Sequence, residues 1–487
     1  MFAVPPGVKA RVGAGSLKRE LAATLALSWP LVLANVAVNV MTVTDFVMLG
    51  WLSPRALAAG ALGFNLYQPM FLLGIGIVAA LSPIVAAKIG AGEDPKGLRR
   101  ATSQALLSAL LISAGAWIVL SQTTGILIAI GEPPDLARDA GTYMRGFQWG
   151  LAPNLLFFAG RSAFAALERP RPTLFAGLVG VAFNAFANYA LIFGKLGMPA
   201  FGIIGSGLAT TLSQTLMFAL LVGFSLIDPR MRRLGLFALP WLPAGGEFFA
   251  LWRLGLPIGA AVVAEVGVFS AATLVVGLLG RPALEAHAVA LQIASLAFMV
   301  PLGLGQAAMV RVGLAFGARD SAAISRAGWS AFGLTAIFAI LSAATMTAVP
   351  RLLIAPFIEV DAPQNADAVA TAVALLRVTA IFQIFDASQA TLANMLRGLH
   401  DSRWPLVIAL AGYWAVGAPV GVALGFGFSL GPVGVWIGLA SGLAAVAVLL
   451  MIRWLVKERR GFPASGAALG ASMAVSFGSG SERSEMT

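Results

Sequence analysis

Long apolar runs recur along the chain, and they restrict its fold more than any other feature. The clearest run is Leu254–Gly280, which holds 27 residues with a single charge, Glu265, and is flanked by Arg253 and Arg281. An α-helix rises about 1.5 Å per residue, so this run reaches roughly 40 Å, enough to cross an apolar membrane core of about 30 Å with some tilt. The run therefore predicts a membrane-spanning helix with a carboxylate near its middle.

Twelve runs of this kind predict an all-α polytopic membrane protein with twelve transmembrane helices. Hydrophobic residues make up 59% of the 487 residues and charged residues only 11%, with a mean hydropathy of +0.88. Soluble domains carry about 25% charged residues, so an ordinary soluble protein is excluded. The predicted spans are residues 21–50, 62–90, 101–122, 139–168, 172–194, 201–225, 251–279, 288–316, 326–349, 369–398, 404–427 and 432–456.

The basic residues indicate how these spans are oriented. If the N-terminus is inside, 25 Lys and Arg residues fall in inner segments and 7 in outer segments, which accounts for all 32. This distribution follows the positive-inside rule. We therefore expect a multi-pass plasma (inner) membrane protein with both termini in the cytoplasm. Residues 1–20 are predicted to be a basic leader without a removable signal peptide, and residues 457–487 a disordered tail.

An internal repeat becomes visible when positions 227 residues apart are compared. Six spans per half is an even number, so both halves enter the membrane in the same direction, and rocking of one half against the other around a central cavity is favoured. We predict two pseudo-symmetric six-helix lobes, residues 21–227 and 251–456, joined by a cytoplasmic linker over 228–250. Chance identity among Gly-rich and Ala-rich segments is the alternative. The matching positions are Pro30 and Pro257, Gly50 and Gly277, Leu57 and Leu284, Phe71 and Phe298, Gly76 and Gly303, Gly90 and Gly317, and Arg99 and Arg326.

Three carboxylates break this symmetry. Asp45, Glu265 and Asp386 are the acids that fall well inside apolar spans, and the first two have apolar counterparts at the 227-residue offset. Ionisable groups at membrane depth usually face a cavity or a partner and belong to an ion or substrate path. Packing symmetry does not require them, so a chemical role is favoured. The alternative is a structural pair with a buried arginine such as Arg161 or Arg311.

Polar stripes at helical spacing accompany these acids, which predicts that the stripes face inward. Amides inside membrane helices also form hydrogen bonds that merely join helices, and that alternative stays open for the amides alone. The stripes are Asn35, Asn39, Thr42 and Asp45 in the first span, Asn184 and Asn188 in the fifth, and Gln383, Asp386, Gln389 and Asn394 in the tenth.

The depths of two acids predict a shared site. Glu265 lies 12 residues after Arg253, about 18 Å along a helix, and Asp386 lies 11 residues before Arg397, about 17 Å. Burial favours the protonated form of a carboxyl group and a bound cation favours the charged form, so such acids exchange H⁺ for Na⁺ or an organic cation. This chemistry is typical of an antiporter. Glu265 and Asp386 are candidate Na⁺ ligands, and we expect no cofactor beyond the coupling ion, H⁺ or Na⁺.

Several other function classes are disfavoured by the sequence. The chain has no cysteine and two histidines, which argues against thiolate chemistry and a histidine-built metal site. It contains no G-x-S-x-G, H-E-x-x-H or Walker A motif, so we do not expect an enzyme or an ATP-driven pump. Basic residues lie between apolar runs rather than in one patch, so we expect a lipid bilayer and small molecules as partners, and no nucleic acid.

The motifs resemble those of the multidrug and toxic compound extrusion (MATE) family of transporters, specifically its NorM-like branch, over about residues 20–456. Each motif is weak alone, but their order and their positions in the spans make the resemblance specific. They are TDFVMLG at residues 44–50 in the first span, Asn184 and Asn188 in the fifth, Glu265 in the seventh, RVG at 311–313 at the end of the eighth, and Asp386 followed by LRG at 396–398 in the tenth.

The resemblance implies twelve helices in two bundles around a V-shaped central cleft, and export of cationic, lipophilic drugs or dyes against inward Na⁺ or H⁺. It implies that Asp45, Glu265 and Asp386 couple the cation, with Asn184 and Asn188 in the polar network of the N-terminal lobe. We expect a monomer. The remaining residues that we assign to the substrate cavity and its polar network are Asn39, Phe382, Gln383 and Asn394.

One departure from the family pattern concerns the coupling ion. Phe382 stands four residues before Asp386, where NorM-like relatives often carry Tyr. A phenyl ring offers a cation its face but no oxygen, so we favour H⁺, or Na⁺ held by carboxylates and backbone. The alternatives are export or flipping of another solute or lipid-linked substrate within the same superfamily, and a passive channel.

Overall fold

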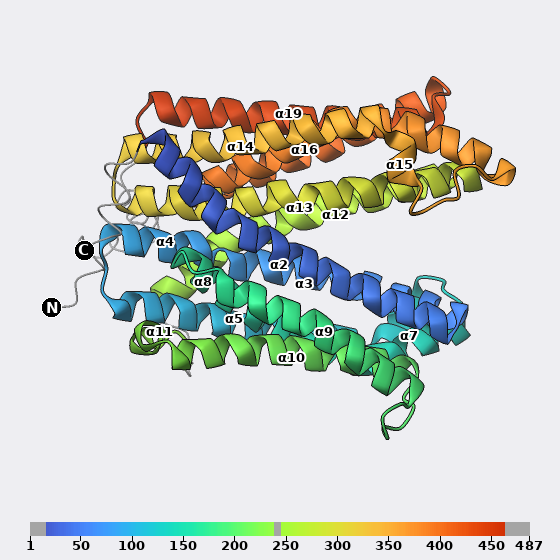
Figure 1. Ribbon diagram of the computed structural model, residues 1–487, viewed down its shortest axis with the longest axis horizontal. Coiled ribbons are helices and arrows are strands. Elements are labelled where there is room, and N and C mark those ends of the chain that lie inside the picture. The colour runs from blue at the N-terminus through green and yellow to red at the C-terminus, as the bar shows by residue number, and fades with distance from the viewer. Residues whose placement is uncertain (1–15, 238–244, 463–487) are drawn as a thin grey trace, which may run out of the picture.

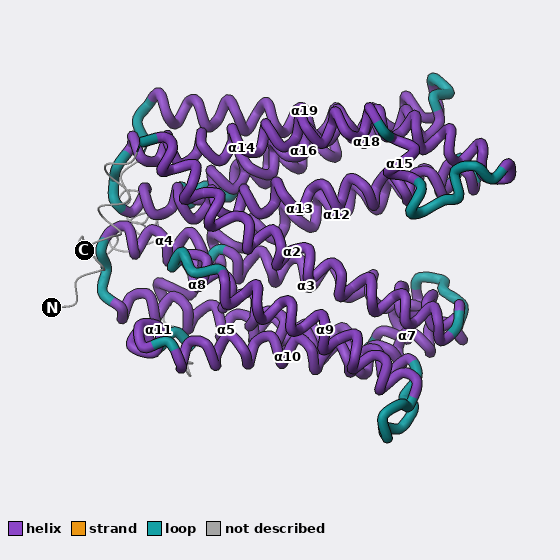
Figure 2. The backbone as a smooth tube through the Cα atoms, viewed as in Figure 1, coloured by secondary structure: helices purple, strands orange, loops and turns teal. Residues whose placement is uncertain are grey.

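The computed structural model describes residues 16–237 and 245–462, and within these ranges it contains helices and no strand (Figures 1 and 2). The long helices run roughly side by side along the longest axis of the molecule. They are α2 (Leu17–Leu52), α3 (Pro54–Ala79), α4 (Leu81–Ala91), α5 (Pro95–Leu120), α9 (Arg171–Phe193), α10 (Ile203–Ile227), α12 (Gly245–Gly277), α13 (Arg281–Gly317), α14 (Ser321–Ala348), α16 (Ala366–Gly398) and α19 (Gly431–Arg459).

Shorter helical segments connect or extend these helices. The π-helical segments η3 and η4 alternate with α17 and α18, so the four together form one continuous span over residues 403–427. The short segments are α6 (Thr123–Ala129), α7 (Pro134–Phe147), η1 (Gln148–Gly150), α8 (Leu151–Ala166), α11 (Pro229–Leu234), α15 (Pro350–Ile354), η2 (Pro363–Asn365), α17 (Arg403–Leu410), η3 (Ala411–Gly417), α18 (Ala418–Val422) and η4 (Ala423–Gly427).

Eleven helical stretches among the described residues are long and apolar enough to cross a membrane, and each falls on a predicted span. The remaining predicted span, residues 139–168, is divided into α7, η1 and α8, none of which is long enough alone. Pro153 has no N–H to bond the carbonyl one turn earlier, which favours the tight turn at residues 148–150. The all-helical membrane fold is therefore confirmed, and the count of twelve stays a prediction.

Local signals set several helix starts. Ser53 accepts a hydrogen bond from the N–H of Ala56 at 3.0 Å, and Asp94 accepts one from Gly97 at 3.0 Å, before helices that begin at a proline. Such side chains bond N–H groups that have no partner in the first turn, and proline lacks that N–H altogether. These capping residues and prolines therefore determine where α3 and α5 begin.

The first and last described helices begin and end close to the outer ends of the first and last predicted spans. Helix α2 begins four residues before the predicted first span, and α19 extends to Arg459, into the first residues of the predicted tail. Basic residues in a last helical turn favour this extension because they interact with the negative end of the helix dipole. Most of the predicted leader (1–15), part of the linker (238–244) and most of the tail (463–487) lie outside the described residues, so the lobe boundaries remain a proposal.

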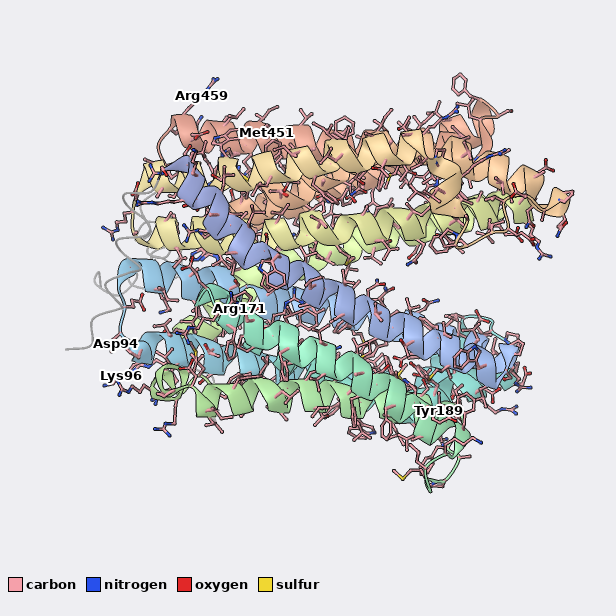
Figure 3. The ribbon with its side chains drawn as sticks, in the orientation of Figure 1. Asp94, Lys96, Arg171, Tyr189, Met451 and Arg459 are labelled. Carbon is pink, nitrogen blue, oxygen red and sulfur yellow. The ribbon has the colours of Figure 1, made fainter. Side chains whose placement is uncertain are left out.

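The helices form two groups that meet near one end of the molecule (Figure 1). Helix α2 begins and α19 ends at this end, on the left of the figure, which we call the terminal end. Asp94, Lys96 and Arg459 lie there, whereas Tyr189 lies toward the opposite end (Figure 3). The two groups diverge toward the opposite end.

Close backbone contacts between α4 and α13 join the two groups. A Cβ atom added to Gly90 would lie 2.0 Å from the carbonyl oxygen of Leu314, and one added to Gly317 would lie 1.9 Å from that of Ala87. Gly317 follows Gly90 by 227 residues, and Leu314 follows Ala87 by the same interval. The two contacts are therefore related by a pseudo-two-fold axis, which confirms the internal repeat.

The same symmetry extends along the interface. A Cβ on Gly76 of α3 would lie 2.1 Å from the Cα of Gly259 in α12, and one on Gly303 of α13 would lie 3.0 Å from the nitrogen of Val32 in α2. Positions 76 and 303, and positions 32 and 259, are again 227 residues apart. Small residues are needed here because only they let helix backbones come this close.

We predict that Gly317→Ala lowers the melting temperature of the detergent-purified protein, because the added methyl group meets backbone and forces α4 and α13 apart. Overpacking of this kind costs about 1–3 kcal/mol. The control is Gly115→Ala in α5, where nothing lies within 4 Å of an added Cβ. Alanine favours a helix over glycine, so the control should keep or raise the melting temperature. Equal effects of the two substitutions would contradict the close contact.

Candidate functional site

The three predicted acids lie in two separate places. Asp45 in α2 and Asp386 in α16 are buried, and Glu265 in α12 is half-buried. Among the described residues, no lysine or arginine forms an ion pair with any of them; Arg161 and Arg311 bond other groups. The structural alternative considered from the sequence, a pair with one of these arginines, is therefore not what the structure contains.

Asp45 is held by three hydrogen-bond donors from two neighbouring helices. Asn184 and Asn188 of α9 donate from their Nδ2 atoms to its Oδ1 at 2.9 and 2.7 Å. Thr210 of α10 donates to Oδ2 at 2.7 Å. The two asparagines are one turn apart, as the sequence predicts for side chains on one helix face. Their Oδ1 atoms are buried and have no hydrogen-bond partner.

Two glycines of α10 bring Thr210 within reach of Asp45. A Cβ on Gly205 would lie 2.5 Å from the carbonyl oxygen of Leu191 in α9, and one on Gly207 would lie 2.6 Å from the nitrogen of Phe147 in α7. The start of α10 therefore packs directly on the backbone of both neighbours. The sequence analysis did not identify Thr210, although its spacing from Gln214 on the same helix was an available signal.

A small cavity of about 50 Å³ opens beside Asp45. Its wall combines aromatic rings with a few polar side chains, and Asp45 is its ionisable acid. The sequence predicted Thr42 to share the inward face with Asp45, and both line the cavity. The other lining residues include Phe64, Tyr67, Tyr143, Phe147, Asn154, Thr210 and Gln214.

Glu265 and Asp386 come together around one amide. Gln389 of α16 donates from Nε2 to Oε1 of Glu265 at 3.1 Å and to Oδ1 of Asp386 at 3.3 Å. The sequence predicted that these two acids lie at a similar depth, and the structure brings both to the same amide. Two carboxyl groups that share a single donor leave most of their oxygen lone pairs available to a cation or a proton.

A much larger cavity, about 480 Å³, contains this pair. Glu265, Asp386 and Asn394 line it, as does Arg397. Arg397 donates to Oδ1 of Asn394 at 3.4 Å, its Nε is buried without a partner, and it makes no ion pair with either acid. The cavity therefore carries two acids and one base. Its volume is in the range of sites that bind small organic molecules.

Phe382 contributes to an aromatic wall of the large cavity. Its ring meets Phe269 edge-on, with centroids 5.9 Å apart, and Trp436 at 5.3 Å. Trp436 donates from Nε1 to Nδ1 of His287 at 3.0 Å, and Nε2 of His287 lies 2.9 Å from the hydroxyl of Thr273 in the cavity wall. Since Nδ1 accepts, Nε2 carries the proton. His287 is therefore engaged in packing the wall.

Other predicted residues lie away from these two cavities. Asn39 is half-buried and lines neither of them, and Gln383 is fully buried with both side-chain amide atoms unpartnered. Asn35 accepts a hydrogen bond from Arg161 at 2.5 Å, and Arg161 also donates to Gln306 at 2.8 Å. The first-span stripe is therefore divided between the small cavity and an interhelical contact.

The comparisons with known proteins agree with this arrangement. The MatE family model matches residues 30–190 and 257–423, two segments that begin 227 residues apart. The "Probable multidrug resistance protein NorM" of Mesorhizobium japonicum is 47% identical over 460 residues, covering 94% of this chain and 98% of the relative. The protein with the same description from Brucella suis biovar 1 is 43% identical over 437 residues, covering 90% and 93%.

Solved structures resemble the fold. A MATE transporter in the bent conformation gives a TM-score of 0.82 at 18% identity, covering 96% of this chain and 99% of that one. The eukaryotic MATE transporter AtDTX14 gives a TM-score of 0.80 at 22% identity, covering 91% and 98%.

We predict that Thr210→Val lowers the stability of the protein by about 1–3 kcal/mol, because it removes the donor to Oδ2 of the buried Asp45. The measurement is thermal unfolding in detergent. The control is Thr215→Val on the same helix, whose exposed hydroxyl bonds the Thr211 carbonyl at 2.8 Å. In an Asp45→Asn background the cost of Thr210→Val should shrink, since a neutral amide needs the donor less. Equal costs in both backgrounds would contradict the contact.

Proposed function

Because the chain belongs to the MatE family of membrane transporters, we propose that it is a multidrug exporter that exchanges cationic, lipophilic compounds for inward H⁺ or Na⁺ by alternating access. One observation carries the proposal: Glu265 and Asp386 share a cavity of about 480 Å³ with no ion pair to either acid among the described residues. Acids without a cationic partner in a water-reachable hollow favour positive ligands.

Competition at the two acids is the simplest coupling mechanism. A proton, Na⁺ or the ammonium group of a drug would each satisfy the same carboxylates, so binding of one displaces another. A ligand shifts a conformational equilibrium only through its differential affinity for the two states. One charge moved through 100 mV yields about 2.3 kcal/mol, which supports roughly a 50-fold concentration ratio.

The aromatic wall supports an organic rather than a purely inorganic substrate. Phe269 and Phe382 line the cavity that holds the acids, and Phe298 and Met299 lie in its wall. Aromatic faces attract organic cations, and methionine adapts to different shapes. The lipid-linked alternative would need a cationic cavity for a pyrophosphate group, whereas this cavity holds two acids and one arginine.

Asp45 supplies a second coupling acid in the other half of the chain. Three donors offset part of the cost of burying its charged form, and the carboxylate oxygens suit a small cation. Its cavity of about 50 Å³ is too small for a drug. We therefore assign Asp45, Asn184 and Asn188 to ion coupling, and the large cavity to the drug.

The terminal end is proposed to face the cytoplasm of a plasma (inner) membrane, since 25 of 32 basic residues belong to that side. The two helix groups meet at this end and diverge at the other (Figure 1). The conformation is then the outward-facing member of the transport cycle. Phe382 brings no oxygen to the cavity, which favours H⁺ over Na⁺ as the coupling ion, with Glu265 and Asp386 as the candidate Na⁺ ligands otherwise. We propose that the monomer is the working unit.

We predict that Glu265→Gln and Asp386→Asn each reduce cation-driven export by at least about tenfold, since each removes one exchangeable charge, worth about 2.3 kcal/mol per 100 mV. Asp45→Asn should also weaken exchange. The measurement is efflux of a fluorescent organic cation from proteoliposomes, first under a pH gradient and then under a Na⁺ gradient. The gradient that drives efflux identifies the coupling ion.

The matched control for this experiment is Glu285→Gln. Glu285 is an exposed acid that pairs with Arg281 within α13, so its loss should leave export unchanged. Wild-type export by both Glu265→Gln and Asp386→Asn would overturn the coupling role of the pair. Efflux that proceeds at equal rates without either gradient would indicate a channel.

A further inference from the structure

A buried ion cluster joins the two halves at the terminal end. Arg311 of α13 donates from Nε and Nη2 to the two oxygens of Glu20 in α2, at 2.8 and 2.7 Å. It also donates from Nη1 to Glu168, after α8, at 2.5 Å. The side chains of Arg311 and Glu20 are only 5% and 10% exposed. One arginine of the C-terminal half therefore binds two acids of the N-terminal half.

A second, weaker cluster crosses between the halves at the same end. Lys88 of α4 lies 3.3 Å from Oε1 of Glu247 in α12 and 2.8 Å from Oε2 of Glu93. Lys88 and Glu247 are 19% and 28% exposed, and Oε2 of Glu247 has no partner. The contact between the halves is thus a single ion pair of moderate length.

The two clusters are related by the internal repeat. Glu247 follows Glu20 by 227 residues, and each lies at the start of the first long helix of its half. The counterpart of Arg311 is Ile84, one helical turn before Lys88 on α4. Each half therefore extends an acid to a base on the other half, on either side of the α4–α13 contact. The symmetry axis places the two pairs there, and the sequence makes them unequal.

We propose that these two cross-half ion pairs are clasps that hold the terminal end closed, with Glu20–Arg311 the strong clasp and Lys88–Glu247 the weak one. The proposal rests on the alternating-access part of the proposed function, since only a transporter that opens this end needs a reversible lock. Charge-assisted bonds stabilise the closed state when the groups are buried. Opening exposes the same groups to water, which replaces the lost bonds, so the lock is reversible.

The clasps differ in how much they restrain opening. A buried, fully bonded arginine is strongly destabilised when its partner is removed, whereas a partly exposed lysine pair contributes little. Loss of the strong clasp should therefore populate the opened terminal end far more than loss of the weak one. Glu20→Gln is the suitable change because Arg311 keeps its bond to Glu168, so the variant should fold.

The experiment uses the absence of cysteine from the natural chain. Ala86→Cys places a single thiol at a fully buried position, facing Gly313 across the α4–α13 contact. In lipid nanodiscs, without substrate or ion gradient, a soluble maleimide should label it only when the terminal end opens. We expect Glu20→Gln to raise the labelling rate by at least about tenfold and Glu247→Gln by about twofold to fivefold.

Charge reversal tests whether the ion pair itself acts as the weak clasp. Lys88→Glu and Glu247→Lys should each raise labelling, and the double variant should return it toward the Ala86→Cys rate. The control is Asp401→Asn, which breaks the ion pair with Arg453 at the same end but within one half, and should change nothing. A faster rate in this control would assign the effect to general loosening and overturn the proposal.

Two further outcomes are decisive. Unchanged labelling in Glu20→Gln, or a reversed pair that labels as fast as its single variants, would overturn the proposal. Labelling needs neither drug nor gradient, so it separates this proposal from the transport function. If labelling follows the clasps while no cation is exported, the clasps stand and the proposed substrate and coupling fail.

Discussion

The close approach of α4 and α13 is the contact on which the rest of the structure depends. Gly90 and Gly317 bring two helix backbones together across the pseudo-two-fold axis, so the halves meet without side chains between them. In an apolar membrane core, burial of apolar surface between helices gives little drive, and such close packing is a main source of association. The contact lies toward the terminal end, which leaves the opposite ends free to diverge (Figure 1).

Symmetry of the scaffold contrasts with asymmetry of its charges. The close contacts of the interface occur in pairs whose positions are 227 residues apart. The two cavities differ, because the small one holds one acid with three donors and the large one holds two acids with one shared donor. The first environment gives one carboxyl group three hydrogen-bond donors beside a small space, and the second places two carboxyl groups in a much larger one. A duplicated fold thus provides two sites that differ in size and chemistry.

Sequence reasoning predicted those features that depend on period and composition. It predicted the helices, the repeat, and the meeting of Glu265 with Asp386, because helix rise and span length fix depth within a membrane. It did not predict Thr210 beside Asp45, or the division of the fourth span at residues 148–150, because both depend on how helices pack rather than on one helix alone. It treated Arg397 as a depth marker and missed its place in the large cavity.

Arg311 and Arg397 are two arginines on membrane helices that differ in how many hydrogen bonds they make. Both lie on membrane helices, yet Arg311 makes three strong bonds to two acids, whereas Arg397 has one weak bond and an unpartnered Nε. A charged group whose hydrogen bonds are all made has its lowest free energy in the closed arrangement. Its bonds break only when water can replace its partners. An unsaturated group beside two acids responds to whatever enters the cavity, because each arriving charge changes the balance among the three. The terminal end and the large cavity therefore contain the same kinds of residue, and the number of hydrogen bonds that each arginine makes distinguishes the two places.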